Sequence, residues 1–62
     1  MHTFILRNQT PVHWTFERRA NGFVITKWVG ATWLVRQTAA ARETLRTWRR
    51  LRRAGYRPAP RD

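Results

Sequence analysis

Five arginines near the C-terminus repeat at the spacing of an α-helix, i, i+4, i+7, i+8 and i+11, which places them on one helix face. They are Arg42, Arg46, Arg49, Arg50 and Arg53. A guanidinium group is always charged, and its planar fork of donors fits phosphate and carboxylate groups. Neighbouring arginines repel one another at these spacings, so local helix stability does not explain the cluster. The pattern predicts a face that binds an anionic partner, and Arg57 extends it beyond the helix end.

An ordinary solvated helix face is the alternative interpretation of this stripe. The aliphatic stems of the arginines would then cover Trp48 and the margin of the neighbouring sheet. A solvated face usually mixes charges of both signs, whereas Glu43 is the one acidic residue in this segment. We therefore favour the binding interpretation.

Lys27 and Arg36 form a second group of candidate binding residues, on an expected outer face of a sheet beside Ile25 and Leu34. A sheet with one bare face can bind nucleic acid in a groove or by stacking. For this face an ordinary polar outer surface is the slightly favoured interpretation, and Ile25 with Leu34 could instead form the patch of a homodimer.

The chain has four tryptophans, Trp14, Trp28, Trp33 and Trp48. Each could stack on a nucleic-acid base. Burial is the stronger expectation for most of them, because a small domain needs large aromatic side chains for its core. If any is exposed, Trp33 and Trp14 are the best candidates.

The residues needed for catalysis are scarce. The chain contains neither serine nor cysteine, and three acidic residues are too few for paired-carboxylate chemistry. His2 and His13 are far apart and have no acidic neighbours, which is a weak metal signal. Each of the three glycines has a turn or helix end to make, so no phosphate loop is expected. The sequence predicts no enzyme, metal, cofactor or small-molecule substrate.

Length and charge indicate a single small domain with an anionic partner. The chain has 62 residues, with 13 basic residues against three acidic ones and a formal net charge of +10. Such a charge opposes compaction and favours an anionic partner. No apolar run approaches the roughly 20 residues of a membrane span. We expect a cytoplasmic protein without a membrane partner.

The secondary structure expected from the pattern is a row of short strands followed by one helix. The strands are Phe4–Arg7, Val12–Arg18, Phe23–Val29 and Thr32–Gln37, and the helix is Ala39–Ala54. Thr38 can cap the helix, and Gly55 fits the left-handed position after it, which would let Tyr56 pack back on Leu51. The fold class is α+β, a small antiparallel three- to four-stranded β-meander packed against one C-terminal α-helix. Residues 1–57 form the domain and residues 58–62 a proline-containing tail.

The register of the central hairpin decides which residues share a face. We expect a three-residue loop, Ala20 to Gly22, that pairs Trp14 with Trp28. A two-residue loop at Asn21-Gly22 would instead pair Trp14 with Val29. A turn at Gly30-Ala31 pairs Trp28 with Trp33. The expected core face then carries Trp14, Phe16, Val24, Trp28, Trp33 and Val35, and the outer face carries Glu17, Ile25, Lys27, Leu34 and Arg36. The apolar helix stripe Ala41, Leu45, Trp48 and Leu51 should cover the core face.

Three antiparallel strands followed by one helix, with basic and aromatic residues on the strands, resemble the plant AP2-type and phage-integrase arm-type DNA-binding domains. The similarity is one of layout, and no contact residue is carried over from it. In those domains the sheet enters the major groove, whereas here the helix carries most of the charge.

Taken together, these patterns predict a small basic protein that binds DNA or RNA by contacting phosphates through the arginine-rich helix face. The alternative is a small accessory or regulatory subunit that docks on an acidic surface of a larger protein assembly.

Overall fold

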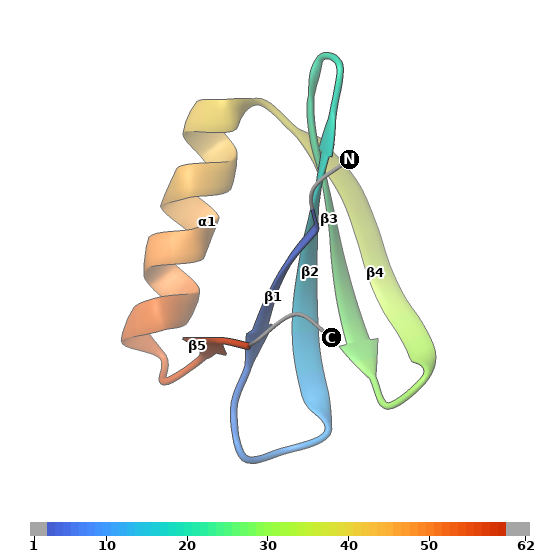
Figure 1. Ribbon diagram of the computed structural model, residues 1–62, viewed down its shortest axis with the longest axis vertical. Helices are drawn as coiled ribbons and strands as arrows, with labels where there is room; N and C mark the ends of the chain where they lie inside the picture. Colours follow the sequence, from blue (N-terminus) through green and yellow to red (C-terminus); the bar gives the residue numbers. More distant parts are fainter. Residues whose placement is uncertain (1–2, 60–62) are drawn as a thin grey trace.

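The computed structural model describes residues 3–59 and shows a five-stranded antiparallel sheet with one helix against one of its faces (Figure 1). The elements in chain order are β1 (Thr3–Arg7), β2 (Val12–Arg19), β3 (Gly22–Val29), β4 (Thr32–Ala39), α1 (Ala41–Arg53) and β5 (Arg57–Pro58). Their order in the sheet is β4-β3-β2-β1-β5. The predicted α+β meander with a C-terminal helix is confirmed. Residues 60–62 of the predicted tail lie outside the described residues.

The short strand β5 was not predicted. After α1, Gly55 has a φ of 102° and turns the chain back, as its position in the sequence suggested. The Tyr56 N–H then donates to the Leu51 carbonyl at 3.1 Å, and Tyr56 packs against the core that contains Leu51. Arg57 comes to lie opposite Arg7 of β1. Proline is tolerated in β5 because the strand lies at the edge of the sheet.

The hairpin between β2 and β3 has neither of the registers considered from the sequence. Arg19 pairs with Gly22, so the loop is Ala20-Asn21, and Trp14 pairs with Lys27 rather than with Trp28 or Val29. Gly22 has a φ of 143° and belongs to β3. A Cβ atom there would lie 2.5 Å from the Ala39 carbonyl oxygen of β4. The glycine is therefore needed for a close approach between strands, and not in the loop where it was expected.

This one-residue difference exchanges the two faces of β3, because successive side chains in a strand point to opposite sides. Ile25 pairs with Phe16 and is buried on the side of α1, at 1% exposure. Lys27 lies on that side too, since it pairs with Trp14. Val24 and Trp28 lie on the opposite side. We call the side covered by α1 the helix-side face and the other side the open face.

A bulge in β4 changes the faces a second time. Trp28 pairs with Trp33 as predicted, but the next pair is Lys27 with Val35, so Leu34 is skipped. Arg36 then pairs with Thr26. As a result Trp33 and Arg36 share the open face, whereas the sequence had placed them on opposite sides.

The helix is shorter than predicted, and its apolar stripe agrees with the prediction in part: Leu51 is buried in the core and Trp48 packs against it, while Ala41 is exposed. Thr38 belongs to β4, and the N-cap is Ala40, which makes no side-chain cap hydrogen bond. Thr44 is buried, and its hydroxyl is satisfied there because it donates to the Ala40 carbonyl at 2.9 Å. Leu45, expected in the core, is 48% exposed.

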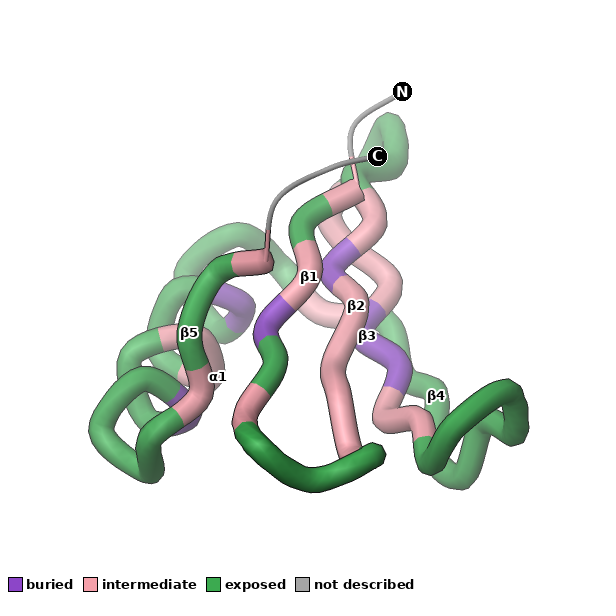
Figure 2. The backbone as a smooth tube through the Cα atoms, turned by 60° about the horizontal axis from the view of Figure 1, so that its bottom comes forward, coloured by how far each residue is buried: buried purple, intermediate pink, exposed green. Residues whose placement is uncertain are grey.

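The core is small and lies between α1 and the three strands β1, β2 and β3. Its buried apolar residues are Leu6, Phe16, Ile25 and Leu51. Trp48 of α1 packs its ring edge-on against Phe16, with 5.1 Å between ring centroids. Figure 2 shows that β4, by contrast, is exposed along almost its whole length.

Candidate functional site

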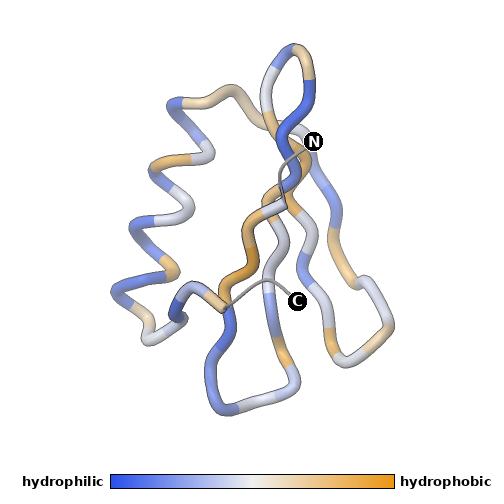
Figure 3. Tube along the Cα trace, in the orientation of Figure 1, coloured by the Kyte–Doolittle hydropathy of each residue, from blue (hydrophilic) through white to orange (hydrophobic). Residues whose placement is uncertain are grey.

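The predicted arginine stripe is present on α1 and lines a groove. All five arginines are exposed, and together with Leu45 they surround a hollow of about 490 Å³. We call this surface the arginine groove; its residues are Arg42, Leu45, Arg46, Arg49, Arg50 and Arg53. Figure 3 shows that α1 is hydrophilic over most of its length, with short apolar segments between. The arginines come together because their spacing is a local property of one helix.

In the part of the chain that the structure describes, no acidic side chain forms an ion pair with the arginine groove. Within residues 3–59 the one ion pair joins Arg19 and Glu17 of β2. Glu43 lies in the first turn of α1, where the helix dipole favours an anion. The last turn carries Arg50, Arg52 and Arg53, where the dipole favours cations. The groove is thus a concentrated positive surface that an external anion can neutralise.

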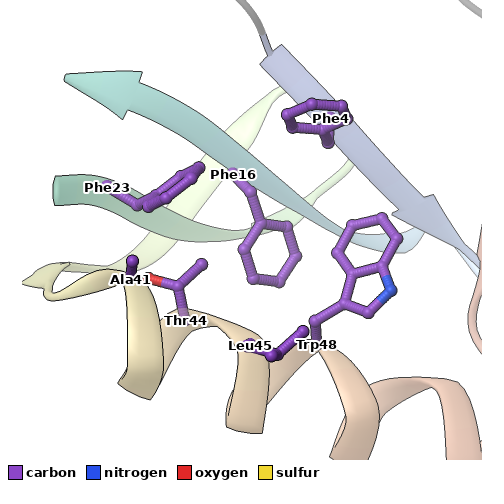
Figure 4. Close-up of a pocket in the computed structure, with 7 residues that line it drawn as sticks. All are labelled: Phe4, Phe16, Phe23, Ala41, Thr44, Leu45 and Trp48. Carbon is purple, nitrogen blue, oxygen red and sulfur yellow. The ribbon is translucent and has the colours of Figure 1, made fainter.

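An apolar pocket adjoins the arginine groove and was not predicted. It has a volume of about 320 Å³ and opens between α1 and the sheet (Figure 4). Its lining residues are Phe4, Phe16, Phe23, Ala41, Thr44, Leu45 and Trp48, and we call it the aromatic pocket. Leu45 belongs to both surfaces. The pocket depends on how far the helix stands from the sheet, which no sequence pattern encodes.

The other predicted binding residues lie elsewhere. The Lys27 ammonium lies 5.7 Å from the Trp14 ring centroid on the helix-side face. Arg36 lies on the open face, where its guanidinium stacks 4.8 Å from the Trp33 ring centroid and its Nε donates to Thr26 Oγ1 at 3.3 Å. Arg57 is in β5 beside Arg7 and does not line the arginine groove. The predicted set therefore divides among three regions of the molecule.

The tryptophans divide between the two faces. Trp33 is 51% exposed on the open face, which confirms it as a candidate for exposure, while Trp14 is half-buried. Trp28 also lies on the open face, against the prediction that it belongs to the core. Because Ile25 is buried in the core, it cannot form a dimer patch with Leu34.

Within residues 3–59 no three potential metal ligands come together. The helix of this region is too short and too polar to cross a membrane. Comparison with protein-family models, with curated proteins and with solved structures finds no match for the chain. The resemblance in layout to AP2-type and integrase arm-type domains therefore stays a prediction.

Proposed function

We propose that the protein binds nucleic acid by contacting backbone phosphates through the arginine groove. The observation that carries this proposal is the concentration of five exposed arginines on one face of α1, none of them in an ion pair with an acidic side chain of residues 3–59. Repulsion among them is relieved when phosphates bind, and each guanidinium can make paired hydrogen bonds to phosphate oxygens. A nucleic-acid partner also agrees with the cytoplasmic location expected from the sequence.

The length of the groove fits a run of phosphates. The 11 helical steps from Arg42 to Arg53 span about 17 Å at 1.5 Å per residue. One strand of a duplex carries a phosphate every 3.4 Å or so along the axis, so about five phosphates fall within that length. Contacts to phosphates fix position without reading sequence. We therefore expect binding with weak sequence preference.

Binding of labelled oligonucleotides, measured by fluorescence anisotropy between 50 and 300 mM salt (roughly the range in which phosphate contacts dominate), tests the proposal. With five phosphate contacts, log affinity should fall with log salt at a slope of about −4.5 for duplex and −3.5 for single strands. Absence of binding at the lowest salt concentration, or an affinity that does not respond to salt, contradicts the proposal.

An accessory subunit that docks on an acidic protein is the second candidate, and the aromatic pocket favours it. A partner could insert an apolar side chain beside Leu45 while its carboxylates meet the arginines, and this combination of anchor and charge is typical of protein interfaces. Affinity purification with and without nuclease distinguishes the candidates. A discrete acidic protein that survives nuclease treatment supports the subunit, and a nuclease-sensitive partner supports nucleic-acid binding.

A further inference from the structure

One residue from each of the five strands forms a continuous row across the open face. Consecutive members are register partners, and in sheet order from β5 to β4 they are Arg57, Arg7, His13, Trp28 and Trp33. Directly paired residues of antiparallel strands share a face, so the five side chains project on the same side. At roughly 4.8 Å between strands the row is about 19 Å long. We call it the cross-strand row.

The β2–β4 end of the row is a surface of aromatic rings. His13 and Trp28 are stacked, with 5.9 Å between ring centroids and 3° between ring planes. Trp28 is held in place because its Nε1 donates to Thr15 Oγ1 at 2.9 Å. Trp33, the next residue of the row, is half exposed and is supported by the Arg36 guanidinium. These rings are fixed by neighbours and lie on the face that α1 leaves uncovered.

The β1–β5 end of the row is a pair of cations. Arg7 and Arg57 are exposed and lie directly opposite each other, an arrangement of like charges that destabilises a sheet unless an anion intervenes. Within residues 3–59 neither forms an ion pair with an acidic side chain. Both line a hollow of about 510 Å³ together with the loop Asn8 to Thr10. That loop is held by a hydrogen bond from the Thr10 N–H to Asn8 Oδ1 at 2.9 Å.

We propose that the open face binds single-stranded nucleic acid, with bases stacked on Trp33 and Trp28 and a backbone phosphate between Arg7 and Arg57. Bases in a duplex are stacked on one another, so flat aromatic rings on a sheet can reach only unpaired bases. This inference rests on the proposed function for the class of ligand. It adds that the second surface takes the single-stranded form of nucleic acid. The two surfaces are separable, because the arginine groove is on α1, which covers the other face of the sheet.

Anisotropy titrations of the full chain with a single-stranded oligothymidylate and with a duplex of equal length test the inference. Trp33→Ala should weaken single-strand binding about tenfold or more, as expected for the loss of one stacked base. Trp33→Phe, which keeps an aromatic ring, should restore most of the affinity. Arg7→Gln should make the single-strand salt slope shallower by about 0.7. Duplex binding should change less than about twofold in all three variants, because the duplex contacts the arginine groove and neither Trp33 nor Arg7 lines that groove.

Arg18→Gln is the matched control, since it removes another exposed arginine, at the far end of β2. The open-face site is overturned if the Trp33→Ala and Arg7→Gln variants bind the single strand as tightly as the original chain does. In that case the proposed function still stands, provided that arginine-groove variants lose binding. If only the arginine-groove variants are without effect, the open face is the binding site and the role of the groove is overturned. Absence of all nucleic-acid binding overturns both. The substituted residues are exposed, and the circular-dichroism spectrum of each variant verifies its fold.

Discussion

Phe16→Ala is expected to remove most of the stability of the domain. Phe16 is 1% exposed, pairs with Ile25 in the sheet and contacts Trp48 of α1 edge-on. Truncating a buried phenylalanine costs about 3–5 kcal/mol. A domain of this length has a free energy of unfolding of about 3–9 kcal/mol in total. Urea unfolding followed by tryptophan fluorescence should therefore show a midpoint shifted to very low urea or a chain already unfolded.

Phe4→Ala is the matched control for this variant. Phe4 pairs directly with Phe16 in the sheet and also contacts Trp48, at 6.3 Å between ring centroids, but it is 47% exposed. It should cost about 1–2 kcal/mol, because less apolar area returns to water and no closed cavity is left. Equal losses for the two variants would show that the core does not lie between α1 and the central strands as described.

Arg46→Gln combined with Arg49→Gln is expected to cause the largest loss of nucleic-acid binding. Both arginines line the middle of the arginine groove. Removing two phosphate contacts should make the duplex salt slope shallower by about 1.8 and weaken binding roughly tenfold or more at 100 mM salt. Glutamine has a helix propensity close to that of arginine, so α1 should stay folded. The measurement is the same anisotropy titration over a range of salt concentrations.

Arg18→Gln combined with Arg19→Gln controls for the change in net charge. These two exposed arginines lie at the end of β2, and Arg19 is already paired with Glu17. If net charge alone attracts nucleic acid, both double variants should lose affinity equally. A slope that changes only in the Arg46 and Arg49 variant places the phosphates in the arginine groove. An unchanged slope in that variant would remove the groove from the binding surface.

The aromatic pocket contributes to one of the two candidate functions only, because phosphates of a nucleic-acid backbone do not bind in an apolar pocket. Leu45 is shared by the pocket and the groove and is half exposed. A protein partner that inserts an apolar side chain there would bury this area, and apolar burial contributes about 25 cal/mol per Å². Phosphate contacts, by comparison, depend on the guanidinium groups alone.

The sequence alone determined the features that depend on short-range geometry. The helical period places the five arginines of the arginine groove on one face of α1, independently of the rest of the chain. Gly55 ends the helix because a left-handed residue is needed there. The Gly30-Ala31 turn lies where it was expected, and it pairs Trp28 with Trp33 because a two-residue turn sets the pairing beside it. Fold class and the arginine groove both follow from such local rules.

Only the tertiary structure decided which residues share each face of the sheet. Gly22 lies in β3 close to the Ala39 carbonyl, a contact between residues 17 positions apart, and the hairpin register differs by one residue from the expected one. The skipped Leu34 then turned Arg36 to the side of Trp33. A strand has a side-chain period of two, so each single-residue shift exchanges inside and outside. The cross-strand row requires four such pairings at once, including that of the unpredicted β5. For this reason the helix surface could be predicted from spacing, while the open face became visible only after folding.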